Sequence, residues 1–577
     1  MAEETSAFIE DVVKRPEILR LTNSDREKQK EKRSNVSFDD ILPDIGDFGK
    51  YQWCLMFALF PYIISYVVLY FSQIFITIVP EERWCKVDAL IDANFTREER
   101  IKIAIPSNDK YPYYDHCYKR DLNYSELLAR KNFSLEQLNA SKVIECTEWE
   151  YNFTQIPYSS IATELDWVCD REYLISTTQA VFFCGSVIGG ILFGWVADHS
   201  GRIPALVICN AIAFLGSVST AFAKSFWSYS LCRFITGLAF DNCVNIPLII
   251  VMEYVAVKRR TWVFNLAFGI YFAFGSTLLP WIAYYIANWK LFALVVSIPF
   301  LNAIITPWIL PESARWYMAN GKINKVVRKV KRIARFNGKN VPLNFYERIA
   351  ISLRESNKSQ ETATLLDLFR TPSLAKNTIL LIIFWFLGIF TFDGHVYSLK
   401  LLQSSVFVSF SLACATELPA GLLLTLILDR WGRRFCGFIT MALTGVFTFV
   451  ELYSESNIIQ LSMSILCRFC LNMAANVGHQ FVAELLPTTV RGQGVALIHI
   501  CGIIGHGMAP YIVDTGMYWT SLPLFIIGIA SFVAAIISLL LPETVGRNLP
   551  QTLEEGENFG KDQKFWSLPC FQSNELD

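Results

Sequence analysis

The chain has 577 residues, of which 53% are hydrophobic, 14% aromatic and only 18% charged, and its mean hydropathy is +0.34. A soluble protein of this length needs more charge to cover its surface, and a net charge of −1 gives no reason to expect a nucleic-acid partner. The composition therefore excludes a chain of ordinary soluble domains and favours a single body embedded in membrane lipid.

In chain order, a polar tail is followed by twelve apolar runs, each long enough to cross a bilayer, which takes about 20 residues as helix. The runs lie near 52–79, 173–197, 203–223, 227–251, 261–287, 290–310, 376–399, 402–428, 435–453, 457–482, 493–513 and 519–541. The sequence therefore predicts an all-α integral membrane protein. The expected parts are a tail at 1–51, a first helix at 52–79, a long loop at 80–172, helices two to six at 173–310, a basic loop at 311–375, six further helices at 376–541 and a second tail at 542–577.

The distribution of basic residues indicates the orientation of these helices. Lys and Arg gather in the loops on the same side as both tails, for example at 258–260, at 430–434 and in RKVKR at 328–332. Because cytoplasmic loops carry the excess of basic residues, both termini are predicted to be cytoplasmic. Residues 1–50 have no apolar stretch, so we expect no cleavable signal peptide.

The long loop has the chemistry of the exocytic route. It carries five Asn-X-Ser/Thr triplets, at Asn94, Asn123, Asn132, Asn139 and Asn152, and four cysteines, Cys85, Cys117, Cys146 and Cys169. Triplets mark N-glycosylation acceptors, and an oxidising compartment favours disulfides, of which four cysteines allow three pairings. The loop is therefore predicted to be extracellular in a plasma-membrane protein. An adhesive cap with no transport role and a substrate-gathering domain both fit this sequence.

An internal repeat relates the two sets of six helices. An offset of 231 residues superposes Asp198 on Asp429 and Glu253 on Glu484, and CRFITG at 232–237 is echoed by CRFCLN at 467–472. Parallel repeats of this kind predict two pseudo-symmetric bundles with a substrate site between them.

The repeated charged residues lie at predicted helix ends, where carboxylates and guanidinium groups can pair in one conformation and separate in another. The predicted gating set is Asp198, Arg202, Glu253, Arg259, Asp429, Arg433, Glu484 and Arg491. Direct contact of these residues with substrate is the alternative. Arg233 and Arg468 are expected to pack between helices or to snorkel rather than to bind anions.

Several motifs together resemble the organic cation, anion and carnitine transporter family of the major facilitator superfamily. They include FDDILPDIGDFGKYQ at 38–52, LDWVCDREYL at 165–174, ELPAG at 417–421 and AELLPTTVRGQGV at 483–495. The resemblance covers about 38–555. It implies the major facilitator fold, with alternating access between the two bundles.

Ionisable residues inside membrane helices are candidates for substrate contact, and a carboxylate framed by aromatic rings suits an organic ammonium. The predicted substrate site comprises Asp393, Phe386, Phe390 and Tyr397 on helix seven, Asp241 and Asn245 on helix four, and Glu417 on helix eight. The resemblance adds Trp385 and Phe392 of helix seven, which occupy positions where cation carriers of this family line the cavity with aromatic residues. The alternative for each carboxylate is a hydrogen-bonded packing role. Tyr62, Tyr66 and Tyr70 form a stripe on helix one that fits packing or cavity lining.

The resemblance also bears on substrate charge. The positions at which anion and carnitine carriers of this family place basic residues are Gly421 and Ile503 here, which argues against an anion specialist. The aspartate of the cation branch is also missing at Ile503. His395, His499 and His506 are expected to have neutral polar or packing roles, with a proton relay as the alternative.

The sequence contains no P-loop, no metal-ligand cluster and no enzyme signature, so neither a cofactor nor a metal is expected. A transporter, a non-transporting receptor on the same fold and a channel-like pore are the classes that remain. The preferred interpretation is a transporter of small organic cations or zwitterions, in contact with membrane lipid. An organic anion or carnitine-like carboxylate carrier of the same family is the alternative. Neither the coupling ion nor the oligomeric state follows from the sequence.

Overall fold

The structure is a computed structural model of the chain that describes residues 38–46, 48–107, 114–130, 142–339, 341–342, 345–346, 364–399, 405–547 and 549–563. The described residues form two compact units. One is drawn from Met1–Tyr51 and Ala314–Gln360, and the other from Gln52–Ser313 and Glu361–Asp577. The second unit contains nearly all of the membrane helices.

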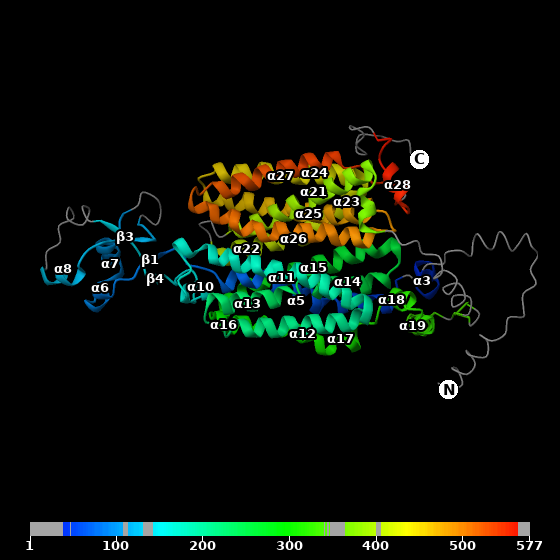
Figure 1. Cartoon of the computed structure of the whole chain (residues 1–577), viewed down its shortest axis with the longest axis horizontal. Helices are drawn as coiled ribbons and strands as arrows, with labels where there is room; N and C mark the ends of the chain where they lie inside the picture. The colour runs from blue at the N-terminus through cyan, green and yellow to red at the C-terminus, as the bar shows by residue number, and fades with distance from the viewer. Residues whose placement is uncertain are drawn as a thin grey trace, which may run out of the picture. The chain divides into compact units, whose positions relative to one another are not determined.

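Twelve helical spans among the described residues are long and apolar enough to cross a membrane, as the sequence predicts. The first six spans use α4 (Lys50–Ala58), α5 (Phe60–Ile76), η1 (Cys169–Arg171), α11 (Tyr173–Ser200), α12 (Arg202–Thr220), α13 (Phe226–Gly237), α14 (Asn242–Glu253), α15 (Val257–Ile286), α16 (Trp289–Val295), η2 (Ile298–Leu301) and α17 (Asn302–Ile309). The last six use α21 (Pro372–Ser398), α22 (Val406–Ala415), α23 (Glu417–Trp431), α24 (Arg433–Tyr453), α25 (Asn457–Leu485), α26 (Arg491–Asp514), η5 (Thr515–Met517) and α27 (Leu522–Leu540). The two sets form two bundles that lie side by side (Figure 1). We call them the N-bundle and the C-bundle.

Two of the interrupted spans break beside a candidate carboxylate, which the hydropathy pattern does not reveal. The fourth span breaks between α13 and α14, and Pro247 lies inside α14. The eighth breaks at Thr416 between α22 and α23, three residues before Pro419. Proline has no backbone N–H, so it cannot make the helical hydrogen bond to the carbonyl four residues earlier. In both spans this unmade hydrogen bond lies within a few residues of the break.

Glycines let helices of the N-bundle pack at backbone distance. A Cβ atom added at Gly189 of α11 would lie 1.9 Å from the Leu238 carbonyl oxygen, and one added at Gly237 would lie 2.1 Å from the Phe182 carbonyl oxygen. Glycine is therefore required where α11 crosses the fourth span.

The segment between the first and second spans forms a small domain, which we call the disulfide domain. Its elements are β1 (Arg83–Cys85), α6 (Asp88–Asp92), α7 (Arg97–Ala104), β2 (Tyr118–Arg120), α8 (Tyr124–Arg130), β3 (Val143–Glu145), β4 (Trp149–Tyr151) and α10 (Ile161–Glu164). Strand β1 pairs antiparallel with β4, and β2 with β3. Of the three possible cysteine pairings, the structure has Cys85 bonded to Cys146 and Cys117 bonded to Cys169.

Three of the predicted glycosylation sites lie on described residues of this domain. The side chains of Asn94 and Asn123 are exposed, whereas the Asn152 Nδ2 donates to Glu82 Oε2 at 2.6 Å. Asn132 and Asn139 lie outside the described residues.

The other unit contains α3 (Phe38–Gly46), α18 (Ala314–Ala319) and α19 (Ile323–Phe336). Helix α19 is strongly amphipathic and buries Ile323, Val326, Val330 and Ile333. Asn337 joins the segments of this unit, since its Oδ1 accepts from the Tyr51 backbone N–H at 2.9 Å and its Nδ2 donates to the Ile45 carbonyl at 3.2 Å. The remaining described elements, η3 (Leu365–Phe369) and α28 (Leu553–Asn558), belong to the larger unit.

Candidate functional site

The repeated charged residues form one cluster in each bundle. In the N-bundle, Arg202 Nη1 contacts Asp198 Oδ1 at 2.8 Å, and the Glu312 carboxylate accepts from the backbone N–H groups of Arg202 and Ile203 at 2.8 and 3.2 Å. Glu253 accepts from the Ser313 hydroxyl at 2.5 Å. A carboxylate thus caps the N-terminus of α12, where it also complements the helix dipole.

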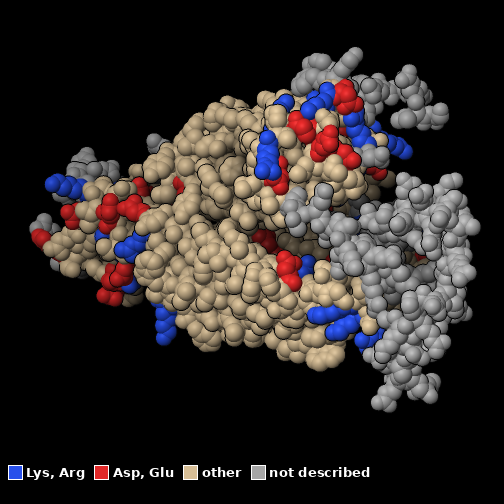
Figure 2. Space-filling model, turned by 45° about the vertical axis from the view of Figure 1, so that its right-hand side comes forward, with Lys and Arg blue, Asp and Glu red and all other residues tan. Residues whose placement is uncertain are grey.

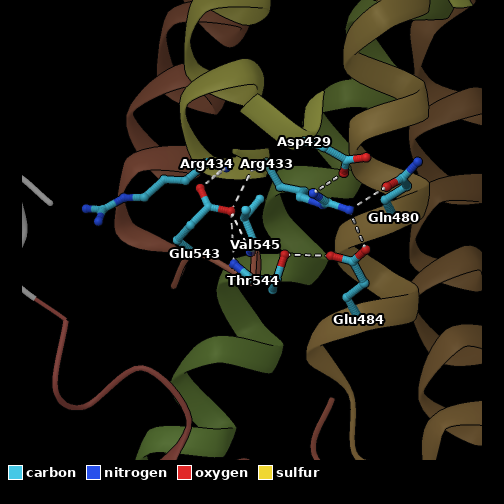
Figure 3. Close-up of polar contacts among 8 residues, drawn as sticks. All are labelled: Asp429, Arg433, Arg434, Gln480, Glu484, Glu543, Thr544 and Val545. Carbon is cyan, nitrogen blue, oxygen red and sulfur yellow. Dashed lines mark hydrogen bonds and ion pairs between the residues drawn. The ribbon is translucent and has the colours of Figure 1, made fainter. Parts of the chain in front are cut away.

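The C-bundle repeats this arrangement at positions 231 residues further along the chain (Figure 3). Arg433 contacts Asp429 at 2.9 Å and Glu484 at 3.0 Å. The Glu543 carboxylate accepts from the backbone N–H groups of Arg433 and Arg434 at 2.9 and 3.0 Å, and the Thr544 hydroxyl donates to Glu484 at 2.6 Å. Each cluster therefore binds a helix-to-helix turn to the segment that follows the last span of its bundle.

The turns themselves depend on glycine. Gly201 and Gly432, also related by the repeat, have φ of +110° and +85°. A Cβ atom at Gly432 would lie 2.4 Å from Glu543 Oε2. Both the backbone conformation and the close approach of the capping carboxylate therefore require glycine.

The repeat adds three residues to the predicted gating set. The Arg491 Nε donates to the Leu486 carbonyl at 3.1 Å, and the equivalent contact in the N-bundle is made by Arg260, whose Nε donates to the Val255 carbonyl at 3.0 Å. Arg260, and not its neighbour Arg259, lies 231 residues before Arg491. The same offset relates the two capping glutamates, Glu312 and Glu543.

The junction of the bundles contains a buried carboxylate. Asp393, in the uninterrupted helix α21, is 1% exposed. Its Oδ1 accepts from the Tyr70 hydroxyl of α5, and its Oδ2 lies 2.5 Å from His506 Nδ1 of α26. The Tyr70 hydroxyl also lies 3.4 Å from His506 Nδ1. Asp393 is therefore held by one group from each bundle.

Aromatic rings from the N-bundle surround this carboxylate and its partners. Phe183 of α11 stacks on the His506 ring at 4.9 Å between centroids with an interplanar angle of 12°. Phe240, in the break of the fourth span, lies 5.3 Å from the Tyr70 ring, 5.7 Å from Phe183 and 5.1 Å from Tyr66. We call Tyr66, Tyr70, Phe183, Phe240 and His506 the aromatic enclosure. Two of the three tyrosines on helix one thus line the junction, whereas Tyr62 is buried and hydrogen-bonded to Thr306 at 2.8 Å.

The aromatic residues predicted on helix seven are distributed differently. Trp385 belongs to the core of the C-bundle and packs on His479 and His499 with ring centroids 4.6 and 5.1 Å apart. Phe386 stacks on Phe390, which is buried with Ala509 and Ala530, and the Phe392 ring lies 3.6 Å beneath the Arg468 guanidinium. Tyr397 is close enough to the Asp393 carboxylate and the Arg233 guanidinium to interact electrostatically with both. Both Arg233 and Arg468 are buried, so they pack between helices and do not snorkel.

The other two candidate carboxylates begin half-helices. Asp241 is the N-cap of α14 and accepts from the Ser186 hydroxyl at 3.0 Å, while Glu417 is the first residue of α23. A carboxylate at a helix N-terminus is stabilised by the helix dipole, and this gives both residues a structural role that Asp393 lacks. Asn245 of α14 is exposed, and Tyr66 lies in electrostatic range of all three carboxylates.

The two bundles meet at the end that carries the disulfide domain. There the Tyr511 hydroxyl lies 3.2 Å from Thr177 Oγ1, and Phe407 packs on Phe75 and Tyr284 with centroids 5.8 and 5.3 Å apart. At the opposite end, Figure 2 shows a hollow between the bundles with acidic side chains along it. The junction around Asp393 is therefore closed on the side of the disulfide domain.

Comparison with known proteins agrees with this arrangement. The sequence profile of the "Sugar (and other) transporter" family matches residues 135–555. The chain belongs to this transporter family. The carcinine transporter of Drosophila melanogaster is 32% identical over 93% of this chain and 82% of its own length, and the organic cation transporter protein of the same species is 28% identical over 91% and 95%. The predicted resemblance to the organic cation transporter family is thereby confirmed.

The transporter also has the expected fold. The xylose symporter XylE, solved with 6-bromo-6-deoxy-D-glucose bound, superposes with a TM-score of 0.56 at 16% identity, covering 88% of this chain and 98% of that one. The chain is thus a multi-pass membrane transporter of the major facilitator fold and not an enzyme.

Proposed function

We propose that this transporter moves small organic cations or zwitterions across the plasma membrane, and that Asp393 receives the ammonium group. The observation that carries the proposal is the position of Asp393, which is buried at the junction of two bundles that must move against each other during transport. A carboxylate inside the membrane is costly, and so it marks a substrate or ion pathway.

The surroundings of Asp393 favour an organic cation over an inorganic one. The aromatic enclosure offers ring faces, each of which stabilises an ammonium group by about 0.5–2 kcal/mol. The positions that would hold basic residues in an anion carrier of this family are Gly421 and Ile503. The names of the carcinine and organic cation transporters, both related over most of this chain, support the same substrate class.

An organic anion or carnitine-like carboxylate carrier is the second candidate. It is favoured by His499 and His506, two histidines in the central helix α26 that can pair with a carboxylate when protonated. A zwitterion could use Asp393 and one of these histidines at the same time.

We propose further that the disulfide domain is extracellular and that both termini are cytoplasmic. Its two disulfides and the exposed triplet residues Asn94 and Asn123 support this orientation, as does the excess of Lys and Arg in the loops at the opposite end. In this orientation the hollow faces the cytoplasm, and the charge clusters around Arg202 and Arg433 act as the gating elements of the cytoplasmic end.

The test is uptake of tetraethylammonium, a permanently charged cation, by cells that express Asp393→Asn. The variant keeps the size of the side chain and removes its charge, so uptake normalised to surface protein should fall by about tenfold or more. Glu451→Gln is the matched control, because Glu451 is equally buried but bonds to Ser464 within the C-bundle. Normal uptake by Asp393→Asn would remove Asp393 from the site, and a wild type that prefers benzoate to tetraethylammonium would support the anion carrier.

A further inference from the structure

Each oxygen of the Asp393 carboxylate already has a partner in the protein. Tyr70 donates to Oδ1, and His506 Nδ1 lies 2.5 Å from Oδ2. The His506 ring is fixed in turn, because Phe183 stacks on its face and Tyr70 and Phe240 meet it edge-on at 5.7 and 6.2 Å. An ammonium group that takes the place of His506 on Oδ2 must therefore break the contact between His506 and Asp393.

The contact places a proton between the histidine and the carboxylate. At 2.5 Å between Nδ1 and Oδ2 two lone pairs would repel each other, so Nδ1 carries a proton. When Nε2 is protonated as well, the ring is an imidazolium paired with the carboxylate. The charged or titratable groups that face His506 are Asp393 from α21, Tyr70 from α5, Asp241 at the start of α14 and His499 on α26 itself. Among these groups, Asp393 makes the closest contact.

The balance of charge then links the substrate to this proton. With both ring nitrogens of His506 protonated and Asp393 ionised, the pair is neutral overall. An organic cation that approached Asp393 while His506 stayed charged would leave two positive charges and one negative charge in a buried site, which is unfavourable at low dielectric. If the imidazolium releases its Nδ1 proton to water in the hollow, the cation takes over as the counter-charge of Asp393 and the site remains neutral.

We infer that a proton on His506 and an organic cation compete for Asp393, so that the transporter exchanges one cation for one proton. This inference rests on the proposed function and adds its coupling ion. The position of the pair also explains how exchange is enforced. Asp393 joins α21 of the C-bundle to Tyr70 of the N-bundle, and a site neutralised by either cation or proton can change conformation without moving an unpaired buried charge.

The experiment uses purified full-length protein in liposomes that contain a pH-sensitive dye. The probe is tetraethylammonium, which has no proton of its own to carry. Valinomycin with equal potassium on both sides removes the membrane potential, and the interior is made one pH unit more acidic than the exterior. One-for-one exchange predicts that the probe accumulates transiently by up to about tenfold while the interior becomes more alkaline.

The variant His506→Asn keeps an amide donor for Asp393 and removes the titrating group. It should lose accumulation driven by the proton gradient. The uptake that it retains under an inside-negative potential should be lower than that of the wild type, because His506 belongs to the aromatic enclosure, and it should not respond to the pH gradient. His199→Asn is the control, because His199 is exposed at the end of α11 and its Nδ1 contacts the Trp195 carbonyl oxygen. This control should behave as the wild type.

The outcomes separate this inference from the proposed function. If the wild type takes up the probe under a membrane potential but shows neither accumulation nor alkalinisation under the pH gradient, the exchange is wrong and the cation carrier stands. Proton-driven accumulation by His506→Asn would place the exchangeable proton elsewhere. If the wild type moves the probe under neither condition, the proposed function itself fails.

Discussion

At the scale of single residues, the three carboxylates predicted to bind substrate differ in whether the fold alone gives them a role. Asp241 and Glu417 lie at the N-termini of half-helices, where the helix dipole stabilises a negative charge. Asp393 lies within a continuous helix, and its contacts come from two other helices of opposite bundles. The structural roles of the first two therefore leave Asp393 as the carboxylate whose presence calls for a ligand.

The aromatic enclosure leads to a prediction for Phe240. Replacing Phe240 by Leu keeps an apolar side chain but removes a ring face from the junction, so the KM for tetraethylammonium should rise by about 2- to 30-fold, which corresponds to about 0.5–2 kcal/mol. Concentration-dependent uptake in liposomes measures the change. Phe449→Leu is the control, because Phe449 stacks on Phe532 within the C-bundle. Equal KM values in the wild type and Phe240→Leu would remove this ring from the binding site.

At the scale of structural elements, hydropathy predicts the twelve spans because apolar length is a local property of the sequence. The breaks in the fourth and eighth spans are not predicted, since each span as a whole remains long and apolar enough to cross a membrane. Prolines 247 and 419 were the available signal. Asp393 can be nominated from sequence alone, but its partners Tyr70 and His506 lie 323 and 113 positions away and are brought to it only by helix packing.

The carboxylates that cap α12 and α24, one in each bundle, lead to a prediction for stability and transport. Glu543→Ala leaves the first N–H groups of α24 without their acceptor. The free energy of unfolding should therefore fall by about 0.5–2 kcal/mol. The transport rate should fall as well, because the capped turn belongs to the predicted gate. Glu543→Gln keeps an acceptor oxygen and should lose less. Glu312→Ala should reproduce the effect in the N-bundle, since it removes the equivalent cap of α12. Melting temperature in detergent and initial uptake rates measure both quantities, and equal values for the Ala and Gln variants would contradict the capping role.

At the scale of the whole molecule, the two ends of the paired bundles differ in their contacts. Each bundle carries its own charge cluster, and both clusters lie at the end away from the disulfide domain. At the disulfide-domain end the bundles touch through Tyr511, Thr177 and the rings around Phe407. Alternating access requires these contacts to separate in each transport cycle.

This requirement can be tested by tying Thr177 to Tyr511. Their hydroxyl oxygens lie 3.2 Å apart, and the tyrosine side chain spans most of the distance between the two backbones. Cysteine side chains at these positions would therefore be too far apart for a direct disulfide. A short bismaleimide is needed to link them. In liposomes, the linked Thr177→Cys/Tyr511→Cys variant should lose tetraethylammonium transport while it still binds the probe from the open end. Each single-cysteine variant and the wild type, treated with the same reagent, control for reaction at the exposed Cys54 and Cys184. If the linked protein transports at the rate of the untreated one, the bundles do not separate at this end, and access to Asp393 must follow another route.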